Sequence, residues 1–348
     1  MYYFCRMEKN VALSIESNVE LRQFNTFGIN ARAKNLIRLR SEIELPEILR
    51  LASSYEGNIL FLSGGSNLLL TKDWDGLVIK IETKGIEILD EDQEYVYVRV
   101  QAGEIWDDFV QFCISRNFGG VENLTLIPGC VGSSPIQNIG AYGVEVKDVF
   151  YMLEAVSLRT GEFREFYKDE CQFGYRYSIF KGEYKNRYLI LSVTFRLHKN
   201  PQLNLSYEAV EVETKRLGLP LNIETISKAI TNIRRSKLPD PKEIGNSGSF
   251  FKNPLIGERD FKLLESRFPE IRYFKNEEGY KLAAGWLIES CGWKGFREGD
   301  AGVHDRQALV LVNYGNASGK QIKALSEKIS DSVYKKFGVK LEAEVNIL

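Results

Sequence analysis

Apolar residues recur along this chain with two periods, the 3.6-residue period of an amphipathic helix and the two-residue period of a strand. Pro46 lies in the first turn of one helical stretch, where its missing N–H is tolerated, and Gly57 follows where a helix cap is expected. The first part of the chain predicts, in order, a helix over 43–55, strands over 58–62 and 95–100, a helix over 105–118, and strands over 150–158, 163–167 and 188–197. Interleaved helices and strands indicate the α+β class.

A change of pattern marks the last third of the chain. Two helical stretches over 206–217 and 225–236 lead to Lys237-Leu-Pro-Asp-Pro241, which has the composition of a linker. Beyond it the pattern predicts a helix over 281–291, a strand over 307–313, a helix over 318–337 and a strand over 341–347. We therefore expect three parts, residues 1–80, 81–225 and 226–348.

The composition excludes several classes of function. The 348 residues are 44% hydrophobic and 27% charged, and 46 Lys and Arg stand against 47 Asp and Glu, for a formal net charge of -1. Such a chain has no overall positive field for nucleic acid or an anionic membrane. No run approaches the roughly 20 apolar residues of a membrane span, and the start lacks the apolar core of a signal peptide. We expect a cytoplasmic protein.

Cysteine and histidine give no sign of a disulfide framework or a metal centre. The five cysteines are odd in number, widely spaced and without a C-x-x-C pair: Cys5, Cys113, Cys130, Cys171 and Cys291. His198 and His304 are the only imidazoles, so no zinc-type cluster is visible. Reduced cysteines and no bound metal are expected.

Two glycine-rich stretches are candidates for binding phosphate. The first, Ser63-Gly-Gly-Ser-Asn67, follows a predicted strand and offers main-chain N–H donors with two hydroxyls, although a tight turn would explain it as well. It lacks the G-K-[ST] of a Walker loop and the G-x-G-x-x-G of a dinucleotide fold.

The second stretch, residues 127–145, is the more specific. It combines repeated glycines, two prolines and the pair Gln137-Asn138 in the sequence Ile-Pro-Gly-Cys-Val-Gly-Ser-Ser-Pro-Ile-Gln-Asn-Ile-Gly-Ala-Tyr-Gly-Val-Glu. A loop with only a structural role rarely needs so many special backbone conformations beside amides and hydroxyls. It suggests a rigid cradle of N–H groups for a long anionic cofactor, with Gln137 and Asn138 free to meet buried polar edges.

These loops and several later segments carry a resemblance to a known family. The segments are Asn25-Thr-Phe-Gly28, 63–67, 127–145, Tyr175-Arg-Tyr-Ser-Ile-Phe-Lys181, Ser236-Lys-Leu-Pro-Asp-Pro241, Gly245-Asn-Ser-Gly-Ser-Phe-Phe-Lys-Asn-Pro254 and Leu341-Glu-Ala-Glu-Val345. In this order, from about residue 20 to the end, they resemble the UDP-N-acetylenolpyruvoylglucosamine reductases of peptidoglycan synthesis. Residues 168–187 resemble the extra tyrosine-bearing loop of the first type of this family.

The resemblance implies a fold and two redox partners. It implies a two-part FAD-binding domain like that of vanillyl-alcohol oxidase (PCMH type), followed by a C-terminal α+β substrate domain. FAD would be bound noncovalently, and NADPH would reduce UDP-N-acetylglucosamine enolpyruvate to UDP-N-acetylmuramate for cell wall growth and division. The implied cofactor-binding residues are Ser63, Gly64, Gly65, Ser66, Asn67, Pro128, Gly129, Gly132, Ser133, Ser134, Gln137, Asn138, Ile139, Gly140, Ala141, Tyr142 and Gly143.

Three residues match the catalytic positions of the family. Ser249 matches the proton donor, and Arg176 and Glu344 match the groups that polarise the substrate carboxylate. An ionised Glu344 would repel the developing charge, so we hypothesise that it is protonated or lies beside a cation during the reaction. Ala343 stands where the family commonly has proline, which leaves the carboxylate in place.

Five further residues match positions that contact the substrate. They are Tyr175, on the loop that would close over the sugar nucleotide, and Tyr207, Lys237, Asn253 and Gln307. The basic cluster 234–237 is either a solvated helix end or a contact to a diphosphate. His304 receives no proton-transfer role.

Three other functions compete with this interpretation. An oxidase with the same FAD-binding fold would often tether the flavin through a histidine, and neither histidine lies in a glycine-rich loop. A noncatalytic nucleotide-sugar sensor predicts loss of the proton donor or the carboxylate, and both are present. A nucleic-acid-binding protein disagrees with the charge. We expect a monomer in which NADPH and the UDP-sugar use one space in turn, which gives ping-pong kinetics.

Overall fold

The computed structural model describes residues 13–348 and divides the chain into two compact units. The first unit comprises the described residues up to Val19 together with 33–64 and 75–236, and the second comprises 20–32, 65–74 and 237–348. The start of the main part of the second unit at Lys237 coincides with the expected linker. The three-part division remains a prediction.

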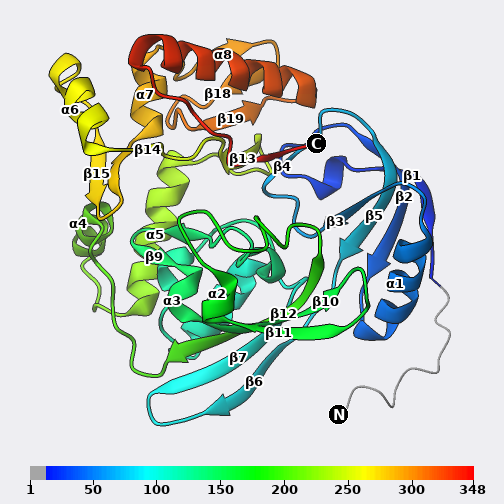
Figure 1. Cartoon of the computed structure of the whole chain (residues 1–348). Helices are drawn as coiled ribbons and strands as arrows, with labels where there is room; N and C mark the ends of the chain where they lie inside the picture. Colours follow the sequence, from blue (N-terminus) through cyan, green and yellow to red (C-terminus); the bar gives the residue numbers. More distant parts are fainter. Residues whose placement is uncertain (1–12) are drawn as a thin grey trace. The chain divides into compact units, whose positions relative to one another are not determined.

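A four-stranded sheet opens the first unit, in the order β1-β2-β5-β3. Its strands are β1 (Glu16–Glu20), β2 (Arg32–Leu39), β3 (Asn58–Leu62) and β5 (Trp74–Ile81). Strands β3 and β5 are parallel and adjacent, with Leu62 opposite Lys80 (Figure 1). Helix α1 (Leu45–Ser54) carries Pro46 in its first turn, as its sequence predicts.

A five-stranded antiparallel sheet, in the order β11-β10-β12-β7-β6, forms the rest of the first unit's framework. Its strands are β6 (Ile86–Glu91), β7 (Tyr95–Gln101), β10 (Phe150–Ser157), β11 (Phe163–Tyr167) and β12 (Tyr188–His198). Alternate residues of these strands and one face of α2 (Trp106–Ser115) bury a large apolar core around Trp106, Phe109 and Phe195. The predicted strands of this region are confirmed to within two residues.

Shorter elements complete the first unit. The hairpin β8 (Gly140–Ala141) and β9 (Val144–Glu145) runs into the single-turn helix α3 (Val146–Val149). Two helices follow β12, namely α4 (Glu208–Leu217) and α5 (Ile223–Lys237). Both agree with the predicted helices to within two residues.

The second unit contains two small antiparallel sheets and three helices. The first sheet has the order β13-β19-β18-β17 and the second the order β14-β16-β15. The first comprises β13 (Gly245–Ser249), β17 (Arg297–Glu298), β18 (Ala301–Val303) and β19 (Val310–Asn313), and the second comprises β14 (Leu255–Ile256), β15 (Tyr273–Asn276) and β16 (Gly279–Leu282). The helices are α6 (Glu258–Arg267), α7 (Ala284–Ser290) and α8 (Gly319–Phe337), of which α8 lies next to β18 and β19 (Figure 1).

The end of the chain differs from its prediction. The expected strand over 341–347 is wrong for most of its length, because regular pairing is confined to β20 (Asn346–Ile347), which runs parallel to β4 (Leu68–Leu69). The preceding residues make one isolated bridge, between Ala343 and Phe251. A single bridge is not a ladder of hydrogen bonds between strands, so the alternation of side chains predicted a longer strand than the structure has. The expected strand over 307–313 is likewise shorter, since it begins at Val310.

Within residues 13–348, no helix combines the length and the apolar character that crossing a bilayer requires. The same residues hold no group of three or more His, Cys, Asp or Glu side chains arranged to bind a metal ion. Cys113, Cys130 and Cys171 are buried free thiols and Cys291 is a half-buried one, whereas Cys5 lies outside the described residues.

Candidate active site

The two glycine-rich loops meet inside the first unit. Strand β3 ends at Leu62, so Ser63 and Gly64 lie just past the carboxyl end of a parallel pair, where open α/β sheets bind ligands. A Cβ atom placed on Gly64 would lie 2.8 Å from the Cα of Gly129 and 3.3 Å from the main-chain nitrogen of Cys130. Only glycine at residue 64 lets the two backbones touch in this way.

Main-chain donors are concentrated where the loops touch. Among the described residues, nothing accepts a hydrogen bond from the N–H groups of Gly64, Gly129 or Cys130. The amides just beyond are occupied, since Val131 donates to Glu104 at 2.9 Å and Gly132 to Ala102 at 2.9 Å. Three unoccupied N–H groups from two touching loops form the kind of nest that binds phosphate.

A buried hydroxyl adds to this arrangement. Ser134 is 1% exposed, and its Oγ has no hydrogen-bond partner in the part of the chain that the structure describes. A buried hydroxyl without a partner is uncommon, because leaving it so costs about 1–3 kcal/mol. A polar ligand at this loop would remove that cost.

The other end of the glycine-rich loop (residues 127–145) is locked by Asn138. This side chain is fully buried; its Nδ2 donates to Glu145 Oε2 at 2.9 Å and to the Gly174 carbonyl at 3.1 Å, and its Oδ1 accepts from the Lys147 N–H at 3.0 Å. The expectation that the Asn138 amide is free for a cofactor is therefore wrong. It holds the β8–β9 hairpin and the 174–177 turn together, and any cofactor contact by its main chain stays a prediction.

Arg176 occupies a strained position in the turn that Asn138 supports. Gly174 and Tyr177 bond to each other at 3.1 and 3.2 Å, and Arg176, at the third place of this turn, has φ +53°. That place usually takes glycine, and a non-glycine residue there costs about 1–3 kcal/mol. The guanidinium lies 5.3 Å from the Tyr175 ring, and its Nη2 donates to the Gly140 carbonyl at 2.9 Å. This bond ties Arg176 to the glycine-rich loop.

Two predicted residues, Tyr142 and Tyr207, pack together. Their rings lie 5.3 Å apart at 90°, and Tyr142 has φ +50°. The Tyr142 side chain is hydrogen-bonded to the Arg234 guanidinium; burial raises the pKa of Tyr142 and lowers the pKa of Arg234. Tyr207 remains 40% exposed. A buried guanidinium bonded to one tyrosine can also meet an anionic ligand, and the choice between a solvated helix end and a diphosphate contact for the basic cluster stays a prediction.

In the second unit, Ser249 follows a β-bulge. Asn246 is opposite Val312, but Ser249 is opposite Val310, so β13 carries one extra residue between them. Gly248 adopts φ +67° within the bulge. Bulges re-aim side chains and are common next to active sites. Ser249 is exposed, and its hydroxyl forms no hydrogen bond with another described residue.

Glu344 lies on the segment next to Ser249. Its main-chain N–H donates to the Phe250 carbonyl at 2.8 Å, and the Lys252 N–H donates to the Glu342 carbonyl at 2.9 Å. Its carbonyl accepts from Asn67 Nδ2 at 3.2 Å, and Asn67 O accepts from the Asn346 N–H at 3.1 Å. The Asn67 amide thus holds the end of the chain in place, and the structure brings Ser249 and Glu344 onto neighbouring stretches of backbone.

Two predicted substrate residues converge on the start of α7. Asn253 Oδ1 accepts from the Ala284 N–H at 3.0 Å, and Gln307 Oε1 would lie 3.1 Å from a Cβ atom on Gly285. Both amides therefore border a helix N-terminus, where the local field favours negative charge. Lys237 is the exposed last residue of α5.

His304 takes no evident part in this arrangement. It is 3% exposed, its Nδ1 accepts a long 3.4 Å bond from the Arg306 N–H, and burial lowers its pKa. A histidine held neutral and buried agrees with the absence of a proton-transfer role.

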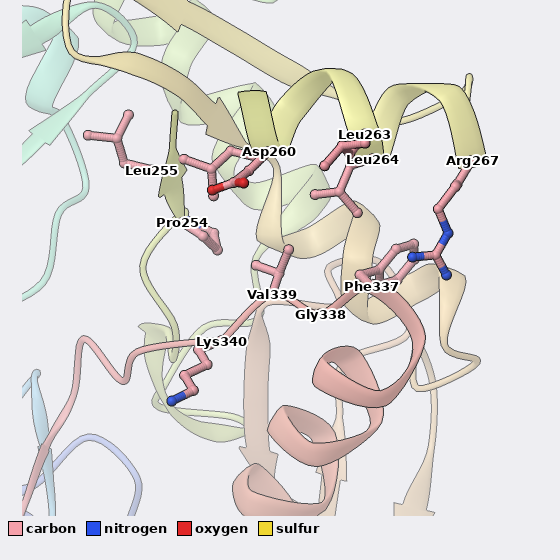
Figure 2. Close-up of a pocket in the computed structure, with 11 residues that line it drawn as sticks. Pro254, Leu255, Asp260, Leu263, Leu264, Arg267, Phe337, Gly338, Val339 and Lys340 are labelled. Carbon is pink, nitrogen blue, oxygen red and sulfur yellow. The ribbon is translucent and has the colours of Figure 1, made fainter. Parts of the chain in front are cut away.

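Two hollows lie away from the predicted site residues. A groove of about 410 Å³ lies in the second unit, between α6 and the end of α8. Leu263, Leu264 and Arg267 line it from α6 (Figure 2). A cavity of about 1120 Å³ in the first unit lies against Arg99, Glu154 and the turn after β10. No predicted site residue lines either of them.

The residues at the two loops fit an anionic flavin cofactor. Free N–H groups at the Gly64–Gly129 contact and the buried Ser134 hydroxyl suit a diphosphate. Residues 33–167 match the model of the FAD binding domain family. The chain is therefore an FAD-binding flavoprotein of the α+β class, as expected.

Comparison of the whole chain narrows this class to one family. Residues 240–348 match the C-terminal domain of UDP-N-acetylenolpyruvoylglucosamine reductase. Reductases of that name from Flavobacterium johnsoniae and Pseudomonas aeruginosa are 50% and 46% identical over 97% of this chain and all of their own length. The crystal structure of the Thermus caldophilus reductase aligns with a TM-score of 0.66 at 23% identity, covering 97% of this chain and 99% of that one, and supports the fold. This chain belongs to the UDP-N-acetylenolpyruvoylglucosamine reductase family, and it is an FAD-dependent oxidoreductase.

Proposed function

We propose that this enzyme reduces UDP-N-acetylglucosamine enolpyruvate to UDP-N-acetylmuramate with NADPH as the electron donor, a step of peptidoglycan synthesis. One observation carries the proposal beyond family membership: Ser249 is exposed, on a bulge, next to the backbone that bears Glu344. That pair supplies a hydroxyl as a proton source and a carboxyl group together. We also propose that the enzyme is a cytoplasmic monomer.

Bound FAD would supply the hydride chemistry, with NADPH as the donor and C3 of the enolpyruvyl group as the acceptor. The protein then has two tasks, to hold the substrate carboxylate while negative charge grows on it and to deliver a proton to C2.

Ser249 delivers the proton at C2 in this proposal. A serine hydroxyl is a weak acid, so it suits only a strongly basic, carbanion-like acceptor. The bulge and Gly248 at φ +67° support the role, because they set the direction of the side chain independently of the strand's alternation. No hydrogen bond within the described residues restrains the hydroxyl.

Arg176 and Glu344 act on the substrate carboxylate. A guanidinium can bind a carboxylate through two parallel N–H donors and favour added negative charge. The strained turn of Arg176 supports such a role, since strain of this kind gathers at functional sites. Glu344 has to be neutral or beside a cation to assist, and a Glu344→Gln variant tests this. A pH–rate profile with the same shape and height as the parent would exclude the carboxyl group from the reaction.

The substrate residues divide between the two units. Tyr175 and Tyr207 belong to the first unit, and Lys237, Asn253 and Gln307 belong to the second. Aromatic rings and a lysine are suited to a uracil ring and a diphosphate, and the two amides at the start of α7 are suited to the sugar or its carboxylate.

An anaerobic absorbance titration of the purified protein tests the reaction. We expect flavin absorbance to bleach with NADPH and to return when UDP-N-acetylglucosamine enolpyruvate is added. Recovery only with oxygen would indicate an oxidase, and a flavin that NADPH leaves oxidised would contradict the choice of donor. Parallel lines in initial-rate plots are expected if NADPH and the UDP-sugar share one space, and intersecting lines would exclude sharing.

A further inference from the structure

A buried serine, to which the family resemblance assigns no role, lies two residues after Arg176. Ser178 is fully buried, and its hydroxyl donates to the Ile136 carbonyl of the glycine-rich loop at 2.7 Å. The same oxygen accepts a 3.3 Å bond from the Phe180 N–H. The hydroxyl therefore acts as a donor and an acceptor at once, and it joins the segment that bears Arg176 to the glycine-rich loop.

The residues that follow Ser178 are anchored in the apolar core. Ile179 and Phe180 belong to the large buried cluster of the first unit, and the Phe180 ring lies 5.0 Å from the Phe166 ring. The Ile179 N–H donates to the Cys171 carbonyl at 2.9 Å. Ser178 thus has a rigid neighbour on its C-terminal side, and its own hydrogen bonds fix the direction in which the preceding turn leaves the core.

The turn before Ser178 is held to the glycine-rich loop at two more points. The Asn138 amide donates to the Gly174 carbonyl at 3.1 Å, and the Arg176 guanidinium donates to the Gly140 carbonyl at 2.9 Å. Three hydrogen bonds therefore connect one short turn to this loop. The side chains of Asn138 and Ser178 are both fully buried, and a hydrogen bond is stronger in such surroundings than in water.

The strained conformation of Arg176 depends on support of this kind. Its φ of +53° is one that a residue other than glycine keeps only where its surroundings over-determine it. Loss of the Ser178 hydroxyl would take one partner from the Ile136 carbonyl and one from the Phe180 N–H, and the turn could then relax. Relaxation of the Arg176 backbone would change the direction of the guanidinium, because the backbone angles of a residue set the direction of its side chain.

We propose that Ser178 is a positioning residue, which acts through Arg176 by fixing the turn that presents the guanidinium to the substrate carboxylate. This role rests on the proposed function, in which Arg176 binds that carboxylate. It adds that the glycine-rich loop and Arg176 form one unit whose geometry depends on a buried hydroxyl. A shift of about 1 Å, caused by a change away from the reacting atoms, can lower a rate by about 100-fold.

The test follows both half-reactions of Ser178→Ala by stopped-flow absorbance in single turnovers. We expect the UDP-sugar to reoxidise the reduced flavin roughly 10- to 100-fold more slowly than in the parent, because the guanidinium is misdirected. Reduction of the flavin by NADPH should stay as in the parent, since it involves no substrate carboxylate. A normal rate of reoxidation, or equal losses in the two half-reactions, would overturn the proposal.

A double-mutant cycle separates positioning from general damage. If Ser178 acts only through Arg176, then Ser178→Ala should slow reoxidation no further when it is combined with Arg176→Ala. The same fold loss with and without the arginine would show that the serine acts independently of it, which contradicts the proposal.

Ser326→Ala is the matched control. Ser326 is 5% exposed and its hydroxyl donates at 2.7 Å to the Lys323 carbonyl, but it lies on α8, which bears no predicted site residue. This variant should keep the parental rates of both half-reactions. If Ser178→Ala does not fold, Ser178→Cys keeps nearly the same shape with a weaker donor, and a parental rate of reoxidation in that variant would overturn the proposal.

A measurement without the UDP-sugar tests the positioning by itself. In the FAD-bound enzyme, amide hydrogen exchange of a peptide covering residues 172–180 should be faster in Ser178→Ala than in the parent, because the bonds between Gly174 and Tyr177 open more often. Unchanged exchange would overturn the proposal, whichever reaction the enzyme catalyses. A parent enzyme whose reduced flavin is not reoxidised by the UDP-sugar would contradict the proposed function instead, and hydrogen exchange would then decide the role of Ser178.

Discussion

The glycine-rich loop at 127–145 and the C-terminal segment at 341–348 both carry predicted site residues, yet different forces set their conformations. In the loop, turns at residues with positive φ are set locally, as at Gly129, Asn138 and Tyr142. The C-terminal segment is held by partners far away in the sequence, namely Phe250 and Asn67. The conformation of the glycine-rich loop can therefore be predicted from the sequence, whereas that of the C-terminal segment has to be determined from a structure.

The largest expected effect tests the segment that faces Glu344. We expect Ser249→Ala to lower the rate of UDP-sugar reduction by about 10²–10⁴-fold, the range for loss of a general acid. Reduction of the bound flavin by NADPH should stay as in the parent, because that half-reaction needs no proton at C2. Stopped-flow absorbance measures the two halves separately.

The matched control for Ser249 is Ser266→Ala, on the exposed face of α6, whose hydroxyl donates to the Leu263 carbonyl of the same helix. It should match the parent in both half-reactions. Full activity of Ser249→Ala would remove the serine from the mechanism, whereas loss of flavin reduction as well would point to a structural fault.

The next effect tests the loop. A methyl group on Gly64 would lie 2.8 Å from Gly129 Cα, and backbone cannot give way as a flexible side chain does. We expect Gly64→Ala to destabilise the apoprotein by about 1–3 kcal/mol, as overpacking does, and to weaken FAD retention. Urea unfolding and flavin content after desalting measure the two quantities.

Gly257 supplies the control for that substitution. It precedes α6 with φ -74° and has no atom within 4 Å of a Cβ, so Gly257→Ala should change neither quantity appreciably. Equal behaviour of the two variants would mean that the Gly64–Gly129 contact is not close enough to require glycine.

Local patterns predicted the regular elements well and the site only in part. Pro46 predicts the start of helix α1, and a short apolar run predicts strand β3. The glycines of the glycine-rich loop predict its turns. The parallel pairing of β5 with β3, by contrast, is encoded by no local pattern. The bulge at Ser249 likewise depends on the register with β19.

The dependence on distant pairing also explains the two predictions that were wrong. Asn138 has the composition of a ligand-binding amide, but the hairpin and the 174–177 turn use all of its hydrogen-bonding groups. Residues 341–345 alternate like a strand, but only one bridge pairs them. In both places the local structure depends on a partner that is distant in the sequence and that a local pattern does not predict.

A smaller effect concerns the support of the bulge. Asn246 is 3% exposed; its Nδ2 donates to the carbonyls of Pro239 and Ile244 at 3.2 and 2.9 Å, and its Oδ1 accepts from the Gly248 N–H at 2.9 Å. Asn246→Ala should lower the free energy of unfolding by about 1–3 kcal/mol, because buried partners lose their bonds. If the bulge also aims Ser249, kcat should fall more than KM changes.

The exposed Asn316→Ala provides the comparison for Asn246, and it should leave the stability and the kinetics unchanged. A normal kcat in a destabilised Asn246→Ala variant would mean that Ser249 does not need the bulge to be held by this side chain.

The smallest effect tests the C-terminal segment at Ala343, where the resemblance to the family implies proline. In the bridge with Phe251, the donors are the N–H groups of Glu344 and Lys252, so the N–H of Ala343 takes no part in it. Ala343→Pro should therefore remove no hydrogen bond, and by restricting the unfolded chain it should raise stability by about 0.4–1 kcal/mol or leave it unchanged. The contrast is Asn346→Pro, which deletes the 3.1 Å bond from Asn346 N–H to Asn67 and should destabilise the protein. The midpoints of urea unfolding of the two variants test this prediction. If Ala343→Pro loses as much stability as Asn346→Pro, the backbone at residue 343 does not have the extended conformation that proline accepts. The pairing with Phe251 would then involve more than a single bridge.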